Sequence, residues 1–237
     1  MNHTFSPLGD RALKIEFGQT IGQMEYEKVM RGVELLDQVS LGWLIEVVPS
    51  YTSITVFYDP FLLERYQDNR HSPYELACKK IEEIMMNDNS DERKNERLIE
   101  IPVCYGGKLG PDLSFVAQYN QLSEEEVIDL HASGDYLVYM LGFAPGFPYI
   151  GGMNKKIAAP RRETPRFSIP PGTVGIAGEQ TGIYPIETPG GWQLIGRTPK
   201  ALFLPEENPP TLLQAGDRIS FKPISYREYL SLGGDDF

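Results

Sequence analysis

The chain has 237 residues and a formal net charge of −11, from 33 acidic and 22 basic side chains. This length supports one large domain or two modest ones, and the negative charge repels nucleic-acid backbones and anionic membrane surfaces. The two cysteines, Cys78 and Cys104, form no CxxC pair or Cys/His cluster, so neither a disulfide framework nor a metal site is indicated. The N-terminus shows no signal-peptide pattern, and no apolar run could span a bilayer. We expect a cytoplasmic protein that binds neither nucleic acid nor membrane.

The first part of the chain predicts a small α+β domain. Residues 12–17 alternate apolar and polar side chains, as in a half-buried strand, and residues 21–39 carry apolar side chains at helical spacing. Residues 43–48 and 53–58 are rich in β-branched and aromatic side chains, which favours a pair of strands. A capping box at Ser72-Pro73-Tyr74-Glu75 begins a helix that runs to about residue 87. The order β-α-β-β-α indicates an open sheet covered on one face by helices.

Residues 87–96, NDNSDERKNE, contain no apolar side chain and are dense in charge. Such a segment is typical of a linker. We therefore expect two domains, an N-terminal α/β sandwich at residues 1–90 and a second domain at residues 91–237. The alternative is that this segment is a surface loop within a single domain.

The second part of the chain predicts a barrel. It begins with a strand at 98–105, a short helix at 112–119, a helix from the capping box at Ser123 to about residue 132, and a strand at 136–141. Short strands separated by Gly/Pro corners follow, at 173–177, 182–187, 192–196, 201–204 and 218–222, with a last helical turn at 226–230. Many short strands at close spacing indicate a closed or nearly closed β-barrel.

The stretch from Leu141 to Thr198 is dense in glycine and proline, yet aromatic and aliphatic side chains lie between them. It is therefore neither a flexible linker nor a disordered tract. It contains GFAPGF at 142–147, the segment PRRETPR at 160–166, and PGGW at 189–192. Proline restricts the backbone and glycine allows conformations that other residues avoid. So many of both in one stretch favours loops that hold a fixed shape around a ligand or partner.

Several common catalytic and nucleotide-binding motifs are absent from the sequence. Lys108 follows two glycines, but residue 102 is proline where the GxxxxGK phosphate loop needs glycine. GxGxxG, HExxH and GxSxG patterns are also missing. The chain therefore carries no standard nucleotide-binding or hydrolase signature.

Four arginines lie in the Gly/Pro-rich stretch of this acidic chain: Arg161, Arg162, Arg166 and Arg197. Guanidinium groups on rigid loops are suited to bind a carboxylate or a phosphate. We favour Arg166 because prolines flank it closely. The alternative is that each arginine pairs with a nearby glutamate such as Glu163, Glu179 or Glu187.

His131, near a predicted helix end, is the only histidine close in sequence to this stretch, and it is either a general base or a structural side chain. The aromatic residues of the stretch line a pocket or fill the barrel core. We name His131 and Arg166 as candidate catalytic residues. The candidate substrate-binding residues are Phe143, Pro145, Gly146, Phe147, Tyr149, Arg161, Arg162, Gln180, Tyr184, Trp192 and Arg197.

The motifs GFAPGFPYIGG, PRRETPR and GTVGIAGEQTGIYPIETPGGWQLIGRTP, with EVVPSYTSITVFYDP earlier in the chain, resemble the KipI/PxpB family. That family is also described as subunit 1 of the allophanate hydrolase-like pair, and as subdomains C and D of a biotin-dependent carboxyltransferase domain. The resemblance covers nearly the whole chain. It implies an N-terminal α+β domain followed by a cyclophilin-like β-barrel.

The resemblance implies a non-autonomous subunit of an ATP-dependent 5-oxoprolinase, which converts 5-oxo-L-proline to L-glutamate with PxpA-type and KipA/PxpC-type partners. ATP, with magnesium, would then be used by the assembled complex, and this chain alone would be inactive and bind no cofactor tightly. The second hypothesis is a KipI-type inhibitor of histidine kinase autophosphorylation. A third, peptidyl-prolyl isomerase, rests on fold analogy alone.

Overall fold

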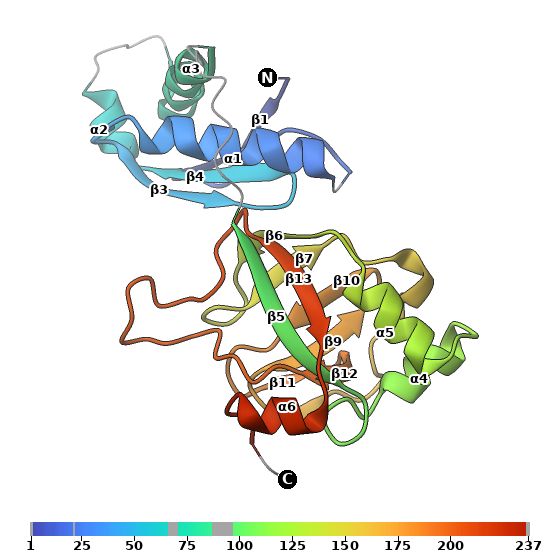
Figure 1. Cartoon of the computed structure of the whole chain (residues 1–237). Coiled ribbons are helices and arrows are strands. Elements are labelled where there is room, and N and C mark those ends of the chain that lie inside the picture. The colour runs from blue at the N-terminus through green and yellow to red at the C-terminus, as the bar shows by residue number, and fades with distance from the viewer. Residues whose placement is uncertain (1, 21, 66–70, 87–96, 236–237) are drawn as a thin grey trace. The chain divides into compact units, whose positions relative to one another are not determined.

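The computed structural model describes residues 2–20, 22–65, 71–86 and 97–235 (Figure 1). The chain divides into two compact units, Met1–Lys94 and Asn95–Phe237. The predicted linker at 87–96 lies outside the described residues. Each unit has its own cluster of buried apolar side chains.

The first unit is an antiparallel sheet in the order β1-β2-β4-β3, packed against helices (Figure 1). Its elements are β1 (Thr4–Pro7), β2 (Ala12–Glu16), α1 (Gln23–Asp37), β3 (Leu44–Pro49), β4 (Ser53–Tyr58), α2 (Pro60–Glu64) and α3 (Pro73–Met86). Leu13, Ile15 and Ile54 from the sheet pack with Val29 of α1 and Ile81 of α3. The predicted α+β class is confirmed.

The start of α3 shows why local sequence signals were reliable in this unit. The Ser72 N–H donates to the Glu75 carboxylate at 2.8 Å, and the Glu75 N–H donates to the Ser72 hydroxyl at 3.3 Å. This is the predicted capping box. Sequence patterns missed β1 and α2, because both are too short to show a period.

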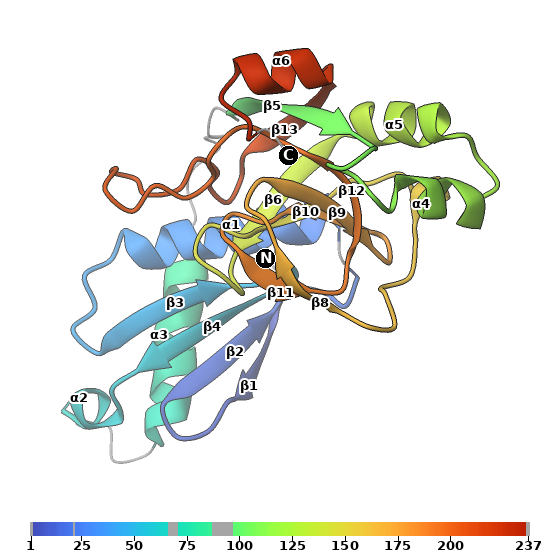
Figure 2. The same ribbon diagram turned by 90° about the horizontal axis from the view of Figure 1, so that it is seen from below.

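The described residues of the second unit form a closed barrel in the order β10-β7-β6-β13-β5-β12-β9 (Figure 2). The barrel strands are β5 (Leu98–Tyr105), β6 (Tyr136–Leu141), β7 (Pro148–Gly151), β9 (Thr173–Ala177), β10 (Gln180–Ile183), β12 (Gln193–Arg197) and β13 (Arg218–Pro223). The helical elements are α4 (Leu113–Tyr119), α5 (Glu124–Ala132), α6 (Tyr226–Ser231) and a 3₁₀ turn at Lys155–Ile157. The parallel pair β5–β13 joins strands far apart in sequence, and the predicted barrel is confirmed.

Two predicted strands differ from the structure. The strand expected at 182–187 is β10 at Gln180–Ile183, and the strand expected at 201–204 is reduced to a single bridge between Phe203 and Thr211. The Leu204 N–H does donate to the Pro210 carbonyl at 2.8 Å. However, Pro209 and Pro210 have no N–H to donate in return, so a ladder cannot extend.

A short ribbon of β8 (Arg166–Ile169) and β11 (Thr188–Gly190) lies outside the barrel order (Figure 2). Its register pairs Thr188 with Ile169 and Gly190 with Arg166. The sequence predicted loops here, because each strand is brief and rich in residues typical of turns. The ribbon is what fixes the backbone of Arg166, one of the predicted site residues.

Candidate functional site

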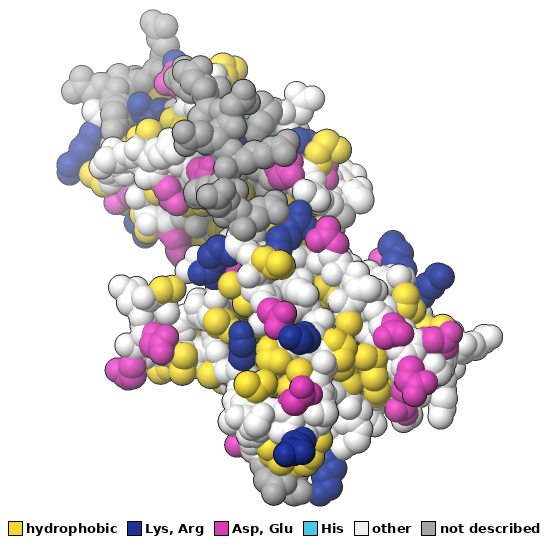
Figure 3. Space-filling model, in the orientation of Figure 1, with side chains coloured by type: hydrophobic (Ala, Val, Ile, Leu, Met, Phe, Trp, Pro, Cys, Tyr) yellow, Lys and Arg dark blue, Asp and Glu magenta, His cyan; other side chains and the backbone are white. Residues whose placement is uncertain are grey.

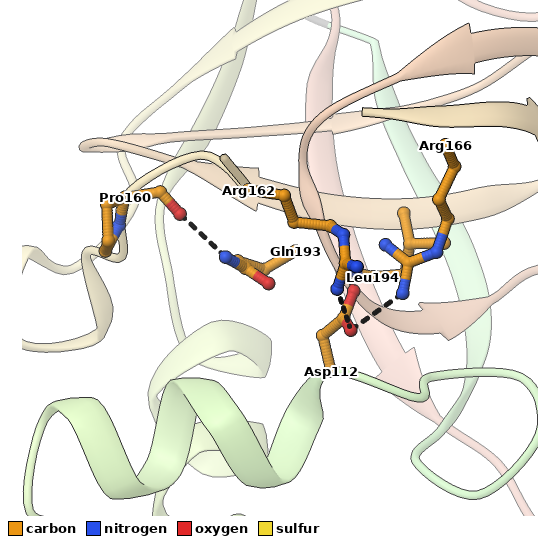
Figure 4. A network of polar contacts seen from close by, with 6 residues as sticks. All are labelled: Asp112, Pro160, Arg162, Arg166, Gln193 and Leu194. Atoms are coloured by element: carbon orange, nitrogen blue, oxygen red, sulfur yellow. Dashed lines mark hydrogen bonds and ion pairs between the residues drawn. The ribbon is translucent and has the colours of Figure 1, made fainter. Parts of the chain in front are cut away.

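Asp112 lies immediately before α4 and accepts hydrogen bonds from three groups (Figure 4). Its Oδ2 accepts from the Leu194 N–H at 2.7 Å, while its Oδ1 accepts from Arg166 Nη2 at 2.8 Å and from Arg162 Nη1 at 3.4 Å. The Asp112 N–H in turn donates to the Leu194 carbonyl at 2.9 Å. Because Leu194 of β12 binds both the carboxylate and the backbone N–H of Asp112, the position of Asp112 is fixed, and Asp112 in turn positions two guanidinium groups.

Neighbouring loops hold the segment 160–166 in place. The Arg162 N–H donates to the Gly191 carbonyl at 2.7 Å, and Gln193 Nε2 donates to the Pro160 carbonyl at 2.8 Å (Figure 4). The β8–β11 pairing fixes Arg166 at the other end of the segment. These contacts restrict the backbone that carries both arginines, so the pair is organised before any ligand arrives.

The charges of this cluster do not balance. Asp112, whose side chain is 8% exposed, meets two guanidinium groups that are 38% exposed for Arg162 and 24% for Arg166. The buried Nη1 of Arg166 has no hydrogen-bond partner. A buried N–H donor without an acceptor is costly, and guanidinium groups bind carboxylates and phosphates readily. The cluster of Asp112, Arg162 and Arg166, which we call the arginine cluster, is therefore suited to bind an anion.

The predicted aromatic residues form one connected group around Phe147. Its ring centroid lies 5.5 Å from that of Phe143, 5.4 Å from Tyr149, 5.6 Å from Tyr184 and 5.8 Å from Trp192. The rings meet edge to face, which is a favourable arrangement for aromatic pairs. Ile169, Ala177 and Leu194 pack into the same group. We call this group of side chains the aromatic cluster.

Tyr184 connects the aromatic cluster to the arginines. Burial raises the pKa of its phenol to about 12, although a hydrogen bond from the Trp192 N–H and the charges of Arg161 and Arg166 act to lower it. Tyr184 therefore remains protonated at neutral pH. The Tyr184 hydroxyl also lies against Gly190, where an added Cβ would clash with it, and Gly190 pairs with Arg166 in the β8–β11 ribbon. The cationic and aromatic parts therefore belong to one site.

The loop at 142–147 is a tight turn between β6 and β7. The Gly142 N–H donates to the Phe147 carbonyl at 3.1 Å, and the Phe147 N–H donates to the Ala144 carbonyl at 3.0 Å. Gly146 has a φ of +76°, and a Cβ there would lie 3.2 Å from the Cβ of Phe203. Pro145 is exposed at the turn. Gly146 thus allows the turn that brings Phe143 and Phe147 together.

His131 is fully buried inside the barrel. Its Nδ1 lies 2.7 Å from the Tyr105 hydroxyl and its Nε2 lies 2.9 Å from Thr181 Oγ1, and its ring packs 4.5 Å from that of Phe221. Burial lowers its pKa to about 3, so it is neutral. A histidine whose nitrogens are both engaged within the core cannot meet a substrate, and a structural role replaces the catalytic one that we expected.

Two other predicted residues lie apart from the arginine cluster. Arg197 is 5% exposed, and it donates to the Pro171 carbonyl at 2.8 Å and to the Asp235 carboxylate at 3.2 Å. Gln180 begins β10 opposite Ala177, at the edge of the aromatic cluster. Arg197 is thus committed to the C-terminal segment of the chain, and we do not include it in the site.

Asp112 is the site residue that the sequence did not reveal. The pattern placed it at a helix start, where an aspartate ordinarily caps the helix. Its side chain makes no cap hydrogen bond and turns instead to Leu194 and the arginines. This role depends on the contact between Asp112 and Leu194, which are 82 positions apart in the sequence, so no local pattern could have indicated it.

Within the described ranges, no group of three or more His, Cys, Asp or Glu side chains is placed to hold a metal ion. Among the helices of those ranges, none combines the length and the apolar character needed to cross a membrane.

The chain thus combines a four-stranded α+β unit with a closed barrel that carries an arginine cluster beside aromatic rings. Residues 3–213 match the family "Carboxyltransferase domain, subdomain C and D". The chain belongs to this family. It is 52% identical over 230 residues to a 5-oxoprolinase subunit of Bacillus subtilis (strain 168), covering 97% of this chain and 96% of the relative. It is also 39% identical to the corresponding 5-oxoprolinase subunit of Escherichia coli O157:H7, covering 91% and 94%.

Solved structures show the same fold. PH0987 from Pyrococcus horikoshii is 42% identical, with a TM-score of 0.55, covering 95% of this chain and 100% of that chain. TTHA0988 is 33% identical with a TM-score of 0.76, and here the match covers 91% of this chain but 40% of that chain. The chain is therefore a homologue of these 5-oxoprolinase subunits, and its fold also occurs within a longer polypeptide.

Proposed function

We propose that this chain is the PxpB-type subunit of an ATP-dependent 5-oxoprolinase that opens the lactam of 5-oxo-L-proline to L-glutamate. In this proposal it acts with PxpA-type and KipA/PxpC-type subunits, and the assembled complex uses ATP with magnesium. The names of the relatives support an enzyme subunit. The observation that carries a role for this chain in substrate binding is the arginine cluster, with the unpartnered Nη1 of Arg166.

The substrate class fits the chemistry of the site. 5-Oxoproline is a small ring with one carboxylate and one lactam, so it needs a cation for the carboxylate and apolar surface for the ring. Arg166 and Arg162 provide the cations, and the aromatic cluster provides the apolar surface. The same guanidinium groups could instead neutralise a phosphate, since both anions present oxygen pairs.

Lactam opening near neutral pH needs coupling to ATP. Transfer of the terminal phosphoryl group to the lactam oxygen would make the ring carbon electrophilic. Water then adds to this carbon, and the ring C–N bond breaks, so that the nitrogen leaves as the amine with a proton from that water and the carbon becomes an acyl phosphate. A second water hydrolyses the acyl phosphate to inorganic phosphate and the new carboxylate of glutamate. Negative charge develops on oxygen during these steps, and positioned cations stabilise such charge. In this scheme Arg166 binds and orients, and it transfers no proton.

Arg166→Ala is expected to raise the KM for 5-oxoproline by roughly 10- to 100-fold, since a hydrogen bond between charged groups contributes about 1.5–3 kcal/mol. Arg166→Lys should recover part of this loss, because it keeps the charge without the planar fork. The measurement is glutamate formed by the complete mixture of subunits, 5-oxoproline and ATP, with each subunit omitted in turn.

The matched control is Arg227→Ala, which removes an exposed arginine from α6 and should leave both kcat and KM unchanged. Unchanged kinetics for Arg166→Ala in the assembled enzyme would exclude this residue from the substrate site. If the complete, assembled mixture forms no glutamate, the proposed activity itself is wrong.

A further inference from the structure

Two phenylalanines, one in the aromatic cluster and one near it in sequence, are turned toward solvent. Phe167 in β8 is 95% exposed, and Phe143 is 70% exposed. Phe143 contacts Phe147 of the cluster. Phe167 lies two positions before Ile169, so both side chains leave the same face of β8, and Ile169 packs in the cluster. Phe143 and Phe167, which we call the aromatic rim, are thus two exposed rings on segments whose neighbouring side chains pack in the aromatic cluster.

The backbone of Phe143 is held in an uncommon conformation. Its φ is +69°, in the left-handed region that a bulky side chain seldom adopts. Such a residue costs on the order of 1–3 kcal/mol, and strained positions gather at binding sites. Glycine would relieve the strain, and the ring is mostly exposed, so its edge-to-face contact with Phe147 uses only part of its surface.

Positive charge accompanies the rim. Arg161 and Arg162 are exposed in the segment that leads into β8, with Glu163 beside them. Elsewhere the chain is acidic overall, and on the face shown in Figure 3 acidic and basic side chains are interspersed. Aromatic residues and arginine are the residue types that most often anchor protein interfaces. Charge complementarity therefore favours a partner surface with an apolar pocket edged by carboxylates.

In the solved relative TTHA0988, this fold is part of a longer polypeptide. Its chain is much longer, and the present chain corresponds to 40% of it. The relative from B. subtilis, by contrast, is a separate chain of nearly the same length as this one. A fold that is one part of a longer polypeptide in one protein and a separate chain in another has faces that a second polypeptide can cover.

We propose that the aromatic rim is the docking surface for the second subunit of the assembly, a KipA/PxpC-type chain that buries Phe143 and Phe167 in an apolar pocket edged by carboxylates. This inference rests on the proposed function, because that function supplies the partner. Docking at the rim would also exclude water from the adjacent Arg166, whose side chain is 24% exposed.

The test is the affinity of this chain for the purified KipA/PxpC-type subunit, measured by calorimetric titration with no substrate present. Phe167→Ala is expected to raise the Kd by roughly 10- to 100-fold, which is the loss of affinity typical when an anchor residue of an interface is truncated. Phe167 is nearly fully exposed, so its replacement should not disturb folding. As a separate variant, Arg161→Glu should also raise the Kd, and its effect on the Kd should be smaller in high salt because salt screens charge.

The matched control is Phe61→Ala in α2. Phe61 is 70% exposed, as Phe143 is, but it belongs to the other unit. Its Kd should stay within about twofold of the unaltered chain. An unchanged Kd for Phe167→Ala, or an equal loss for Phe61→Ala, overturns the proposal. So does sedimentation showing that the chain alone forms a dimer that Phe167→Ala abolishes, since the rim would then be a contact between copies.

The two proposals fail in different ways. If Phe167→Ala weakens the Kd while no complete mixture forms glutamate, the docking surface stands and the proposed activity is wrong. If Phe167→Ala lowers glutamate formation with no change in the Kd, the rim takes part in the reaction and docking there is refuted.

Discussion

Asp112→Ala is expected to lower the free energy of unfolding of the barrel unit by about 3 kcal/mol. The substitution removes the carboxylate that two guanidinium groups share and leaves the buried Leu194 N–H without its acceptor. Breaking a fully buried ion pair costs about 3–5 kcal/mol, and an orphaned buried N–H costs about 1–3 kcal/mol. Both arginines are partly exposed, so water screens part of the charge effect and the lower end applies.

Urea unfolding followed by tryptophan fluorescence measures this loss. The two tryptophans lie in different units, so a Trp43→Phe background leaves Trp192 as the reporter of the barrel. Asp112→Asn is the matched variant, because it keeps the shape and an acceptor for Leu194 while removing the charge, and it should lose about half as much. A midpoint for Asp112→Ala equal to that of the background would show that Asp112 does not organise this part of the barrel.

The pH dependence of barrel stability is expected to carry a component from His131. The folded pKa of His131 is about 3, below the value of about 6.5 for an unfolded chain. Between these values the unfolded state binds a proton that the folded state does not. The contribution of neutral His131 to the free energy of unfolding is therefore complete above pH 6.5. It decreases by about 1.4 kcal/mol per pH unit as the pH falls from 6.5 toward 3.

His131→Gln isolates this component, because glutamine does not titrate but can still bond to Tyr105 or Thr181. In the Trp43→Phe background, the variant should be less stable at pH 7 by roughly 2 kcal/mol, since ring packing against Phe221 is lost. Its stability should then fall less steeply than that of the parent between pH 6.5 and 4. Parallel pH profiles for the two proteins would mean that His131 titrates normally and is not held neutral by burial.

Much of the fold could be predicted because its elements are specified by nearby residues. The capping boxes at Ser72 and Ser123 form their reciprocal hydrogen bonds, and β6 and β9 begin and end where the hydrophobic pattern predicted. The density of glycine and proline between residues 141 and 198 indicated shaped loops. Those loops do bring the predicted aromatic side chains and two of the predicted arginines together.

The errors share a different cause. Proximity in sequence to the Gly/Pro-rich stretch makes His131 a catalytic candidate, but its side chain is buried in the barrel. Arg197 resembled the other arginines by composition, yet the C-terminal Asp235 holds it. Residues 201–204 read as a strand, and the prolines facing them prevent a ladder.

By itself, the sequence determined most of the elements, the α+β class, the barrel and the family, because these follow from periodicity, caps, turn residues and motifs that act over a few positions. Only the tertiary structure decided which charged groups meet. Asp112 reaches Arg162 across 50 positions, Arg166 across 54 and Leu194 across 82. Such contacts depend on how barrel closure brings β12, α4 and the β8–β11 ribbon together, and no local pattern of residues encodes that distance.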